Sequence, residues 1–161
     1  MSLLRSLSIR NFKCFRERIE IPLSQATYLV GPNNAGKTAV LAAINCFFDS
    51  GAFDYEFINK SALTARQEGF NRSEIGLTID LTGVPGKARK KRLMDAFGSE
   101  IELVKSFTWR EASRTTVVEW LLPGKKKRIE ELDKDLREVV GSVAPSYIHP
   151  QEGAELLERA Q

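Results

Sequence analysis

Eight residues near the N-terminus have the types and the spacing of a loop that binds phosphate. Residues 31–38 read G-P-N-N-A-G-K-T and fit the pattern G-x-x-x-x-G-K-[ST] at every fixed position. Gly31 and Gly36 can adopt backbone angles that other residues avoid, so the loop can wrap an anion with its N–H groups pointing inward. Lys37 would then contact the β- and γ-phosphates of a nucleotide, and the Thr38 hydroxyl would ligate Mg²⁺.

The sequence on each side of this loop predicts the elements that position it. Residues 26–30 (A-T-Y-L-V) are a short β-prone run, which predicts a buried strand. Residues 37–49 predict a helix with one apolar face, formed by Val40, Leu41, Ile44, Phe47 and Phe48. The unpaired N–H groups at the start of such a helix favour an anion. The motif requires this order of strand, loop and helix, and the alternative is a Gly/Asn turn with a coincidental Lys-Thr. The candidate nucleotide-binding set is completed by Asn33, Asn34 and Ala35, mainly through their backbone, and by Ala39.

Composition and charge are those of an ordinary globular chain. With 161 residues, of which 42% are hydrophobic, the chain can form one domain with a core. The net charge of +3 is compatible with an anionic partner but does not identify one. Cys14 and Cys46 have no metal-binding or redox spacing, so we expect free thiols in a reducing cytosol. Because the sequence contains no signal peptide and no run of membrane-spanning length, we expect a cytoplasmic protein without a membrane partner.

The remaining sequence predicts an antiparallel set of strands with short helices. Alternating apolar residues predict strands over residues 3–10, 18–23, 74–81, 101–110 and 115–122, the last two joined by a hairpin turn at 111–114. Residues 11–15 predict a corner, 50–73 an irregular segment, and the region up to Phe97 a short helix after a basic cluster. A further helix is predicted to open at residues 125–128 and to stop at Gly141. Its expected apolar stripe is Ile129, Leu132, Leu136, Val139 and Val140.

Two stretches carry a resemblance to a known family. Residues 7–15 read L-x-I-x-N-F-K-x-F, and residues 29–38 read L-V-G-P-N-N-A-G-K-T before an apolar helix. Together they resemble the N-terminus of SMC/RecF/RecN-like ATPase heads, the branch of ABC-type ATPases that includes DNA-repair heads and the OLD-family nucleases. The resemblance is tight over residues 3–49 and loose beyond. It implies an α/β P-loop NTPase fold like that of ABC-ATPase heads, with an N-terminal antiparallel strand lobe beside an incomplete RecA-like core.

The resemblance also implies a domain organisation and two further site residues. Residues 1–161 would be the N-terminal portion of one head: 1–49 the first strands, loop and helix, 50–73 an irregular segment, 74–144 the rest of the lobe, and 145–161 a Q-loop region. In this family the basic residue of N-F-K lies close to the nucleotide, so Lys13 becomes a phosphate or ribose contact, with a solvated turn lysine as the alternative. The family pattern Y-I-x-x-Q-[GE] resembles residues 147–153, which makes Gln151 a candidate for reaching Mg²⁺ and the attacking water. Pro150 departs from that pattern, and Gln151 could instead cap a helix.

The function implied by the resemblance is binding of ATP and Mg²⁺ within an ATPase. Such a protein closes two heads around ATP and couples hydrolysis to DNA handling, repair or phage defence. The sequence contains neither an apolar run ending in Asp-Glu nor a serine-glycine signature, so we expect this chain alone to bind nucleotide weakly and to hydrolyse little. Two alternatives stay open: a P-loop nucleoside or metabolite kinase, and a non-catalytic docking module.

Two basic runs are candidate contacts for DNA phosphates, because lysine and arginine clusters neutralise phosphates and release counterions. They are Lys87, Arg89, Lys90, Lys91 and Arg92, and Lys125, Lys126, Lys127 and Arg128. Charge runs of this kind are equally typical of a solvated loop and helix edge. Neither run is interleaved with an aromatic residue that could stack on a base.

Overall fold

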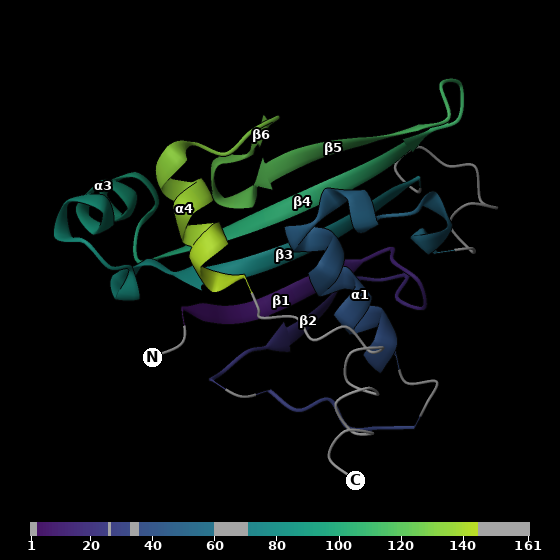
Figure 1. The fold of residues 1–161 in the computed structure, drawn as a ribbon, viewed down its shortest axis with the longest axis horizontal. Coiled ribbons are helices and arrows are strands. Elements are labelled where there is room, and N and C mark those ends of the chain that lie inside the picture. Colours follow the sequence, from purple (N-terminus) through teal and green to yellow (C-terminus); the bar gives the residue numbers. More distant parts are fainter. Residues whose placement is uncertain (1–2, 26, 33–35, 60–70, 145–161) are drawn as a thin grey trace, which may run out of the picture.

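The computed structural model describes residues 3–25, 27–32, 36–59 and 71–144. Within these ranges six strands form one antiparallel sheet in the order β2-β1-β3-β4-β5-β6 (Figure 1). The strands are β1 (Leu4–Arg10), β2 (Ile19–Pro22), β3 (Arg72–Asp80), β4 (Glu100–Arg110), β5 (Thr115–Leu122) and β6 (Lys127–Ile129). The α-helices are α1 (Lys37–Phe48), α3 (Lys87–Phe97) and α4 (Lys134–Val143). Short 3₁₀ turns are η1 (Ser50–Ala52), η2 (Tyr55–Phe57), η3 (Leu81–Gly83) and η4 (Pro123–Lys125).

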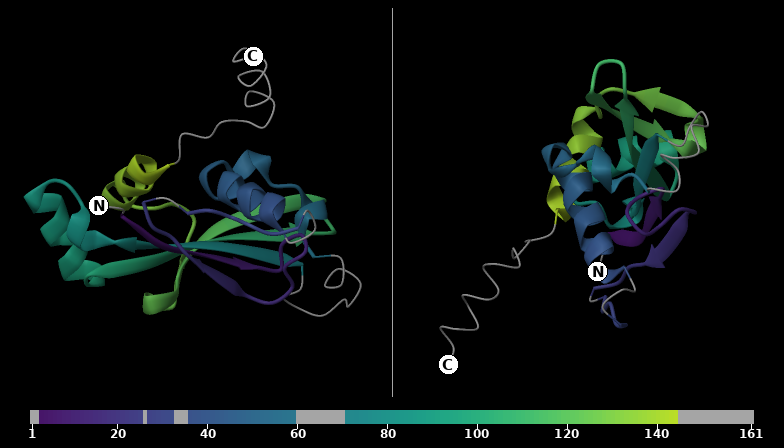
Figure 2. Two further views of the ribbon diagram at one scale, coloured as in Figure 1. Left: turned by 90° about the horizontal axis from the view of Figure 1, so that it is seen from below. Right: turned by 90° about the vertical axis from the view of Figure 1, so that its right-hand side faces the viewer.

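The hydrophobic core lies between one face of the sheet and the helices α1 and α4, which cover that face side by side (Figure 2). The strand register aligns Leu7 of β1, Leu77 of β3 and Leu103 of β4 across the sheet, and all three are buried. Because side chains alternate along a strand, the opposite face carries polar residues such as Ser8 and Glu102. This alternation is the pattern that predicted the strands, and the mixed α/β fold with an antiparallel lobe is confirmed.

The strand predicted immediately before the phosphate-binding loop is wrong. Residues 27–30 are irregular, and the side chains of Tyr28 and Val30 are 85% and 91% exposed. A strand forms when its backbone groups pair with a neighbouring strand, and none of the six described strands pairs with this segment. The apolar run has β-prone residues but lacks the partner that would turn them into a buried strand.

The helix predicted from residue 125 begins later, at Lys134. Lys126 has a φ of 49°, so the chain turns there after η4, and residues 127–129 return as β6 beside β5. The carboxylate of Asp133 accepts the backbone N–H of Leu136 at 2.9 Å and caps α4. The helix then continues past Gly141 to Val143. Of the expected apolar stripe, Leu136 and Val139 are buried in α4 and Val140 is partly buried there, whereas Leu132 is buried before the helix begins and Ile129 belongs to β6.

The other predicted boundaries agree closely with the structure. Strand β5 has the predicted bounds, α3 ends at Phe97 as expected, and residues 111–114 form the turn between β4 and β5. No helix in the described part of the chain is long and apolar enough to span a membrane.

Candidate phosphate-binding site

The N-terminus of α1 directly follows the predicted phosphate-binding loop. Gly36 stands at the N-cap position with a φ of 88° and a ψ of 9°, and no side chain of the described residues caps the helix there. The first N–H groups of α1 lack partners within the helix and lie at the positive end of the helix dipole. The ammonium of Lys37 reaches back across the loop and donates to the carbonyl oxygen of Gly31. Thr38, in the first turn, is exposed.

A corner between β1 and β2 supports the loop from one side. A Cβ atom added to Gly36 would lie 2.6 Å from Cζ of Phe15 and 3.0 Å from Sγ of Cys14, so these side chains would have to shift to admit it. Glycine is thus required at this position both for its left-handed backbone and for its lack of a side chain. The predicted loop and the predicted corner, separate in the sequence, lie against each other in the structure.

Lys13 lies in the same corner and is held by the segment that follows α1. Its N–H donates to the carbonyl oxygen of Phe57 at 2.5 Å, and its own carbonyl oxygen accepts from Nδ2 of Asn59 at 2.7 Å. Its Nζ lies 4.4 Å from the centre of the Phe57 ring, a favourable cation–π distance. The side chain is half-buried rather than fully solvated. Its predicted contact with nucleotide stays a prediction.

The buried face of α1 differs from the predicted one. The residues that face the core are Ala39, Val40, Ala43, Cys46 and Phe47. Leu41 is 42% exposed, because consecutive residues of a helix point about 100° apart and Val40 already faces the sheet. Three of the five buried side chains are small, so α1 approaches the sheet closely.

A buried lysine contacts the C-terminal end of α1. Lys105 of β4 is 5% exposed, and its Nζ donates to the carbonyl oxygen of Phe47 at 2.8 Å. Burial lowers the pKa of Lys105 from 10.5 to about 8, against the opposing influence of Asp49 and Cys46. Burial also raises the pKa of the Cys46 thiol from 9.0 to about 11, against the opposing charges of Lys13 and Lys105.

Sequence reasoning did not single out Lys105, although one signal was present. In the alternation of residues 101–109 it occupies an apolar position of the strand, between Leu103 and Phe107. A lysine in such a row must either reach the surface or find a partner inside. Here it finds the end of the helix that begins at the phosphate-binding loop.

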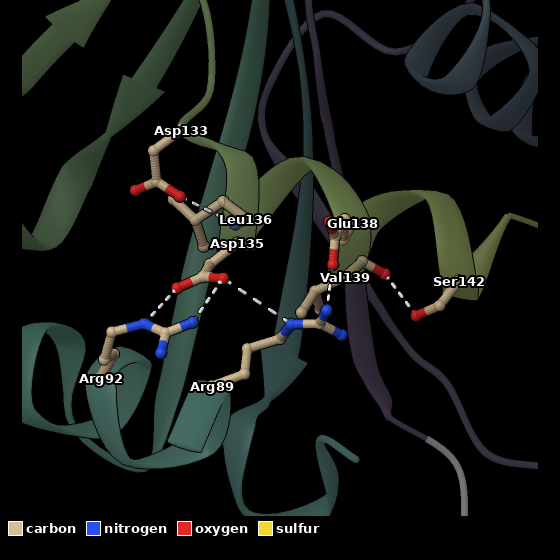
Figure 3. A network of polar contacts seen from close by, with 8 residues as sticks. All are labelled: Arg89, Arg92, Asp133, Asp135, Leu136, Glu138, Val139 and Ser142. Carbon is tan, nitrogen blue, oxygen red and sulfur yellow. Dashed lines mark hydrogen bonds and ion pairs between the residues drawn. The ribbon is translucent and has the colours of Figure 1, made fainter. Parts of the chain in front are cut away.

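Two arginines of the first basic cluster, Arg89 and Arg92, bind carboxylates of α4 (Figure 3). Arg92 binds both carboxylate oxygens of Asp135, at 2.8 and 3.0 Å, and Arg89 forms ion pairs with Asp135 and Glu138. The hydrogen bonds from Arg92 hold the pKa of Asp135 below its ordinary value. Lys91 pairs with Asp95 at 2.7 Å. The two arginines thus join α3 to α4, and Nζ of Lys90 donates to the carbonyl oxygen of Thr82 at 3.0 Å. DNA contact by this cluster stays a prediction.

The second basic cluster is divided among several elements. Arg128 of β6 forms an ion pair with Glu119 of β5 at 3.3 Å, and Nζ of Lys125 lies 4.7 Å from the centre of the Phe97 ring. Lys126 and Lys127 are exposed. Among the other predicted site residues, Asn33, Asn34, Ala35 and Gln151 lie outside the described residues.

Comparisons with known proteins agree with the geometry. Residues 3–140 match the family model described as AAA ATPase domain. The chain is 49% identical over 43 residues to the OLD nuclease of Thermus scotoductus (strain ATCC 700910 / SA-01), over 27% of this chain and 8% of the nuclease. The fold is similar to the SMC head domain from Thermotoga maritima, with a TM-score of 0.52 and 21% identity, over 86% of this chain and 42% of that chain. These matches confirm the resemblance to SMC/RecF/OLD-like P-loop ATPases and the predicted fold class.

Proposed function

Since this chain belongs to the AAA ATPase domain family, we propose that residues 31–38 and the first turn of α1 bind the phosphates of ATP together with Mg²⁺. The observation that carries the proposal is the uncapped start of α1 behind a left-handed Gly36, where any larger residue would be strained and would collide with Phe15. Donors that lack an acceptor, at the positive end of a helix, form a site for a phosphate group.

Each described residue of the loop has a definite task in this proposal. The ammonium of Lys37 moves from the carbonyl oxygen of Gly31 to the β- and γ-phosphates, so that a contact within the loop is exchanged for a stronger one with an anion. The hydroxyl of Thr38, an exposed residue, would ligate Mg²⁺. Ala39 contributes its backbone in the first turn of α1. Bound Mg²⁺ supplies neutralisation of the charge that develops on the phosphates.

The remaining parts of the proposed site rest on the sequence pattern. Asn33, Asn34 and Ala35 would offer backbone N–H groups, and Gln151 would contact Mg²⁺ and the attacking water. For Lys13, the supporting observation is that the next two residues of its corner, Cys14 and Phe15, lie directly against Gly36.

For the whole protein we propose a cytoplasmic ATPase that closes two heads around ATP and uses hydrolysis in DNA handling, repair or phage defence. The support is that one relative is named an OLD nuclease and one structural neighbour is an SMC head domain. The chain spans 8% of that nuclease and 42% of that head, so hydrolysis and the two-head arrangement are proposed for the whole protein. In the same proposal residues 1–161 are the N-terminal portion of one head.

Titration of a fluorescent ATP analogue, with Mg²⁺ present, tests the nucleotide site. The wild-type chain should bind, and Lys37→Ala should weaken binding by at least about tenfold because a charge-assisted contact with phosphate is lost. Lys134→Ala is the matched control, since Lys134 is likewise the first residue of an α-helix but lies in α4. It should bind like the wild type. Equal affinity of the wild type and Lys37→Ala would contradict the proposal.

A further inference from the structure

We propose that Lys105 is a positioning residue that fixes α1 along its axis and thereby places Lys37 and Thr38 for nucleotide binding. The inference rests on the proposed ATP site. Lys105 lies at the opposite end of α1 from that site, so it acts through the helix and not by contact with the ligand.

The contact of Lys105 is directed at one atom of α1. Its Nζ donates at 2.8 Å to the carbonyl oxygen of Phe47, in the last turn of the helix, where carbonyl groups lack partners within the helix. A cation is favoured at this end by the helix dipole. The ring centres of Trp120 and Phe107 lie 5.1 and 5.9 Å from Nζ and enclose it on the sheet side. The amine therefore has a fixed position from which it holds a single carbonyl group.

This contact adds a directed bond to the apolar packing of α1. Three of the five buried side chains of the helix, Ala39, Ala43 and Cys46, are small, and the Phe47 ring packs edge-on against Trp120 with centroids 5.4 Å apart. At the other end of the helix, Gly36 lies in close contact with the side chains of Phe15 and Cys14. The 12-residue helix is a rod about 18 Å long, so a shift at its C-terminus moves the phosphate-binding end equally. The helix is thus held between the corner and Lys105.

Stability alone does not explain a lysine at this position. Burial of an ammonium group is unfavourable, and an apolar side chain of similar length such as methionine would fill the same space without that penalty. What methionine cannot do is hold the Phe47 carbonyl. The feature that methionine would lack is therefore the hydrogen bond to this carbonyl group, which acts on the position of α1.

The charge on Lys105 offers a readout that simple packing would not affect. Its pKa of about 8 lies within the range where nucleotide binding can be measured. The ionisable groups that face it are Asp49 and Cys46, both at the end of α1, and Lys13 lies near the same thiol. Loss of the proton leaves a neutral amine, which makes a weaker hydrogen bond than an ammonium.

The first experiment measures the affinity for the fluorescent ATP analogue at pH 7 and pH 9. Wild-type affinity should fall about fivefold between the two values, which corresponds to the difference between a charged and a neutral hydrogen bond. Lys105→Met should bind about fivefold more weakly than the wild type at pH 7 and show no further fall at pH 9. Lys105→Arg keeps its charge at both values and should retain its pH 7 affinity at pH 9. A Lys105→Met variant with the affinity and the pH profile of the wild type would overturn the inference.

The second experiment needs no nucleotide and separates this inference from the proposed function. Hydrogen exchange of the amides of residues 40–44, which are bonded within α1, should be faster in Lys105→Met than in the wild type, while thermal unfolding shows both proteins folded. Unchanged exchange would overturn the role of Lys105. If Lys37→Ala binds the ATP analogue as the wild type does, the proposed function fails, and the exchange comparison still decides whether Lys105 positions α1.

Discussion

Replacement of Gly36 by alanine should lower the free energy of unfolding by about 2–5 kcal/mol, a sum of two effects that the structure separates. The first is backbone strain: Gly36 has a φ of 88°, and an L-residue in a left-handed conformation costs about 1–2 kcal/mol. The second is a clash, because the new Cβ would lie 2.6 Å from Cζ of Phe15 and 3.0 Å from Sγ of Cys14. Overpacking of this kind costs about 1–3 kcal/mol.

Urea unfolding measures the combined effect as a shift of the midpoint at constant slope. The matched control is Gly141→Ala in α4, where an added Cβ would meet no atom within 4 Å and the backbone is already helical. That control should stabilise the protein by about 0.5–1 kcal/mol, because alanine favours the helix. A pair of alanine substitutions with opposite signs would therefore assign the cost to the backbone angles and close contacts of Gly36.

A double-mutant cycle then isolates the clash from the strain. Phe15→Leu removes the tip of the ring that the new Cβ would meet, so the double variant with Gly36→Ala should be less unstable than the sum of the single changes. We expect an interaction energy of about 1–2 kcal/mol. Strict additivity, or a loss below about 1 kcal/mol for Gly36→Ala alone, would refute the close contact between the corner and the loop.

Two further predictions follow from the electrostatics and exposure of the two cysteines and Lys105. A thiol reagent at pH 8 should label the exposed Cys14 in the folded protein but not the buried Cys46, whose pKa is about 11. Because Cys14 lies against Gly36, Mg-ATP should slow the labelling of Cys14. An unchanged labelling rate would contradict the proposed site. Between pH 8 and 9 the unfolded chain keeps a proton on Lys105 (pKa 10.5) that the folded protein loses (pKa about 8), so stability should rise with pH by about 1 kcal/mol more in the wild type than in Lys105→Met. Above pH 9 this gain in stability is opposed, because the unfolded chain ionises Cys46 while the folded protein keeps it protonated. If the urea midpoints of the wild type and of Lys105→Met changed with pH in parallel, the lowered pKa of Lys105 would be contradicted.

The sequence was sufficient where a pattern is local. Alternation along β5 predicted its bounds because successive side chains of a strand point to opposite faces of the sheet. The start of α1 was likewise encoded by the loop motif itself. The sequence was insufficient where pairing with a distant segment determines the secondary structure. Residues 27–30 have the composition of a strand but pair with no described strand. Residues 125–128 were predicted to open a helix, but the chain turns at Lys126 and then pairs with β5.

The phosphate-binding loop illustrates the same distinction within one site. Its glycines, lysine and threonine can be read directly from eight consecutive residues, but the contacts that fix their position come from segments well separated along the chain. Phe15 precedes Gly36 by 21 residues, and Lys105 follows Phe47 by 58. The sequence marks such supporting residues only as exceptions to a pattern, as with a lysine in the apolar row of a strand. An exception of that kind, in an element that touches the helix behind a motif, is therefore a reason to test the residue for a role in the function of that motif.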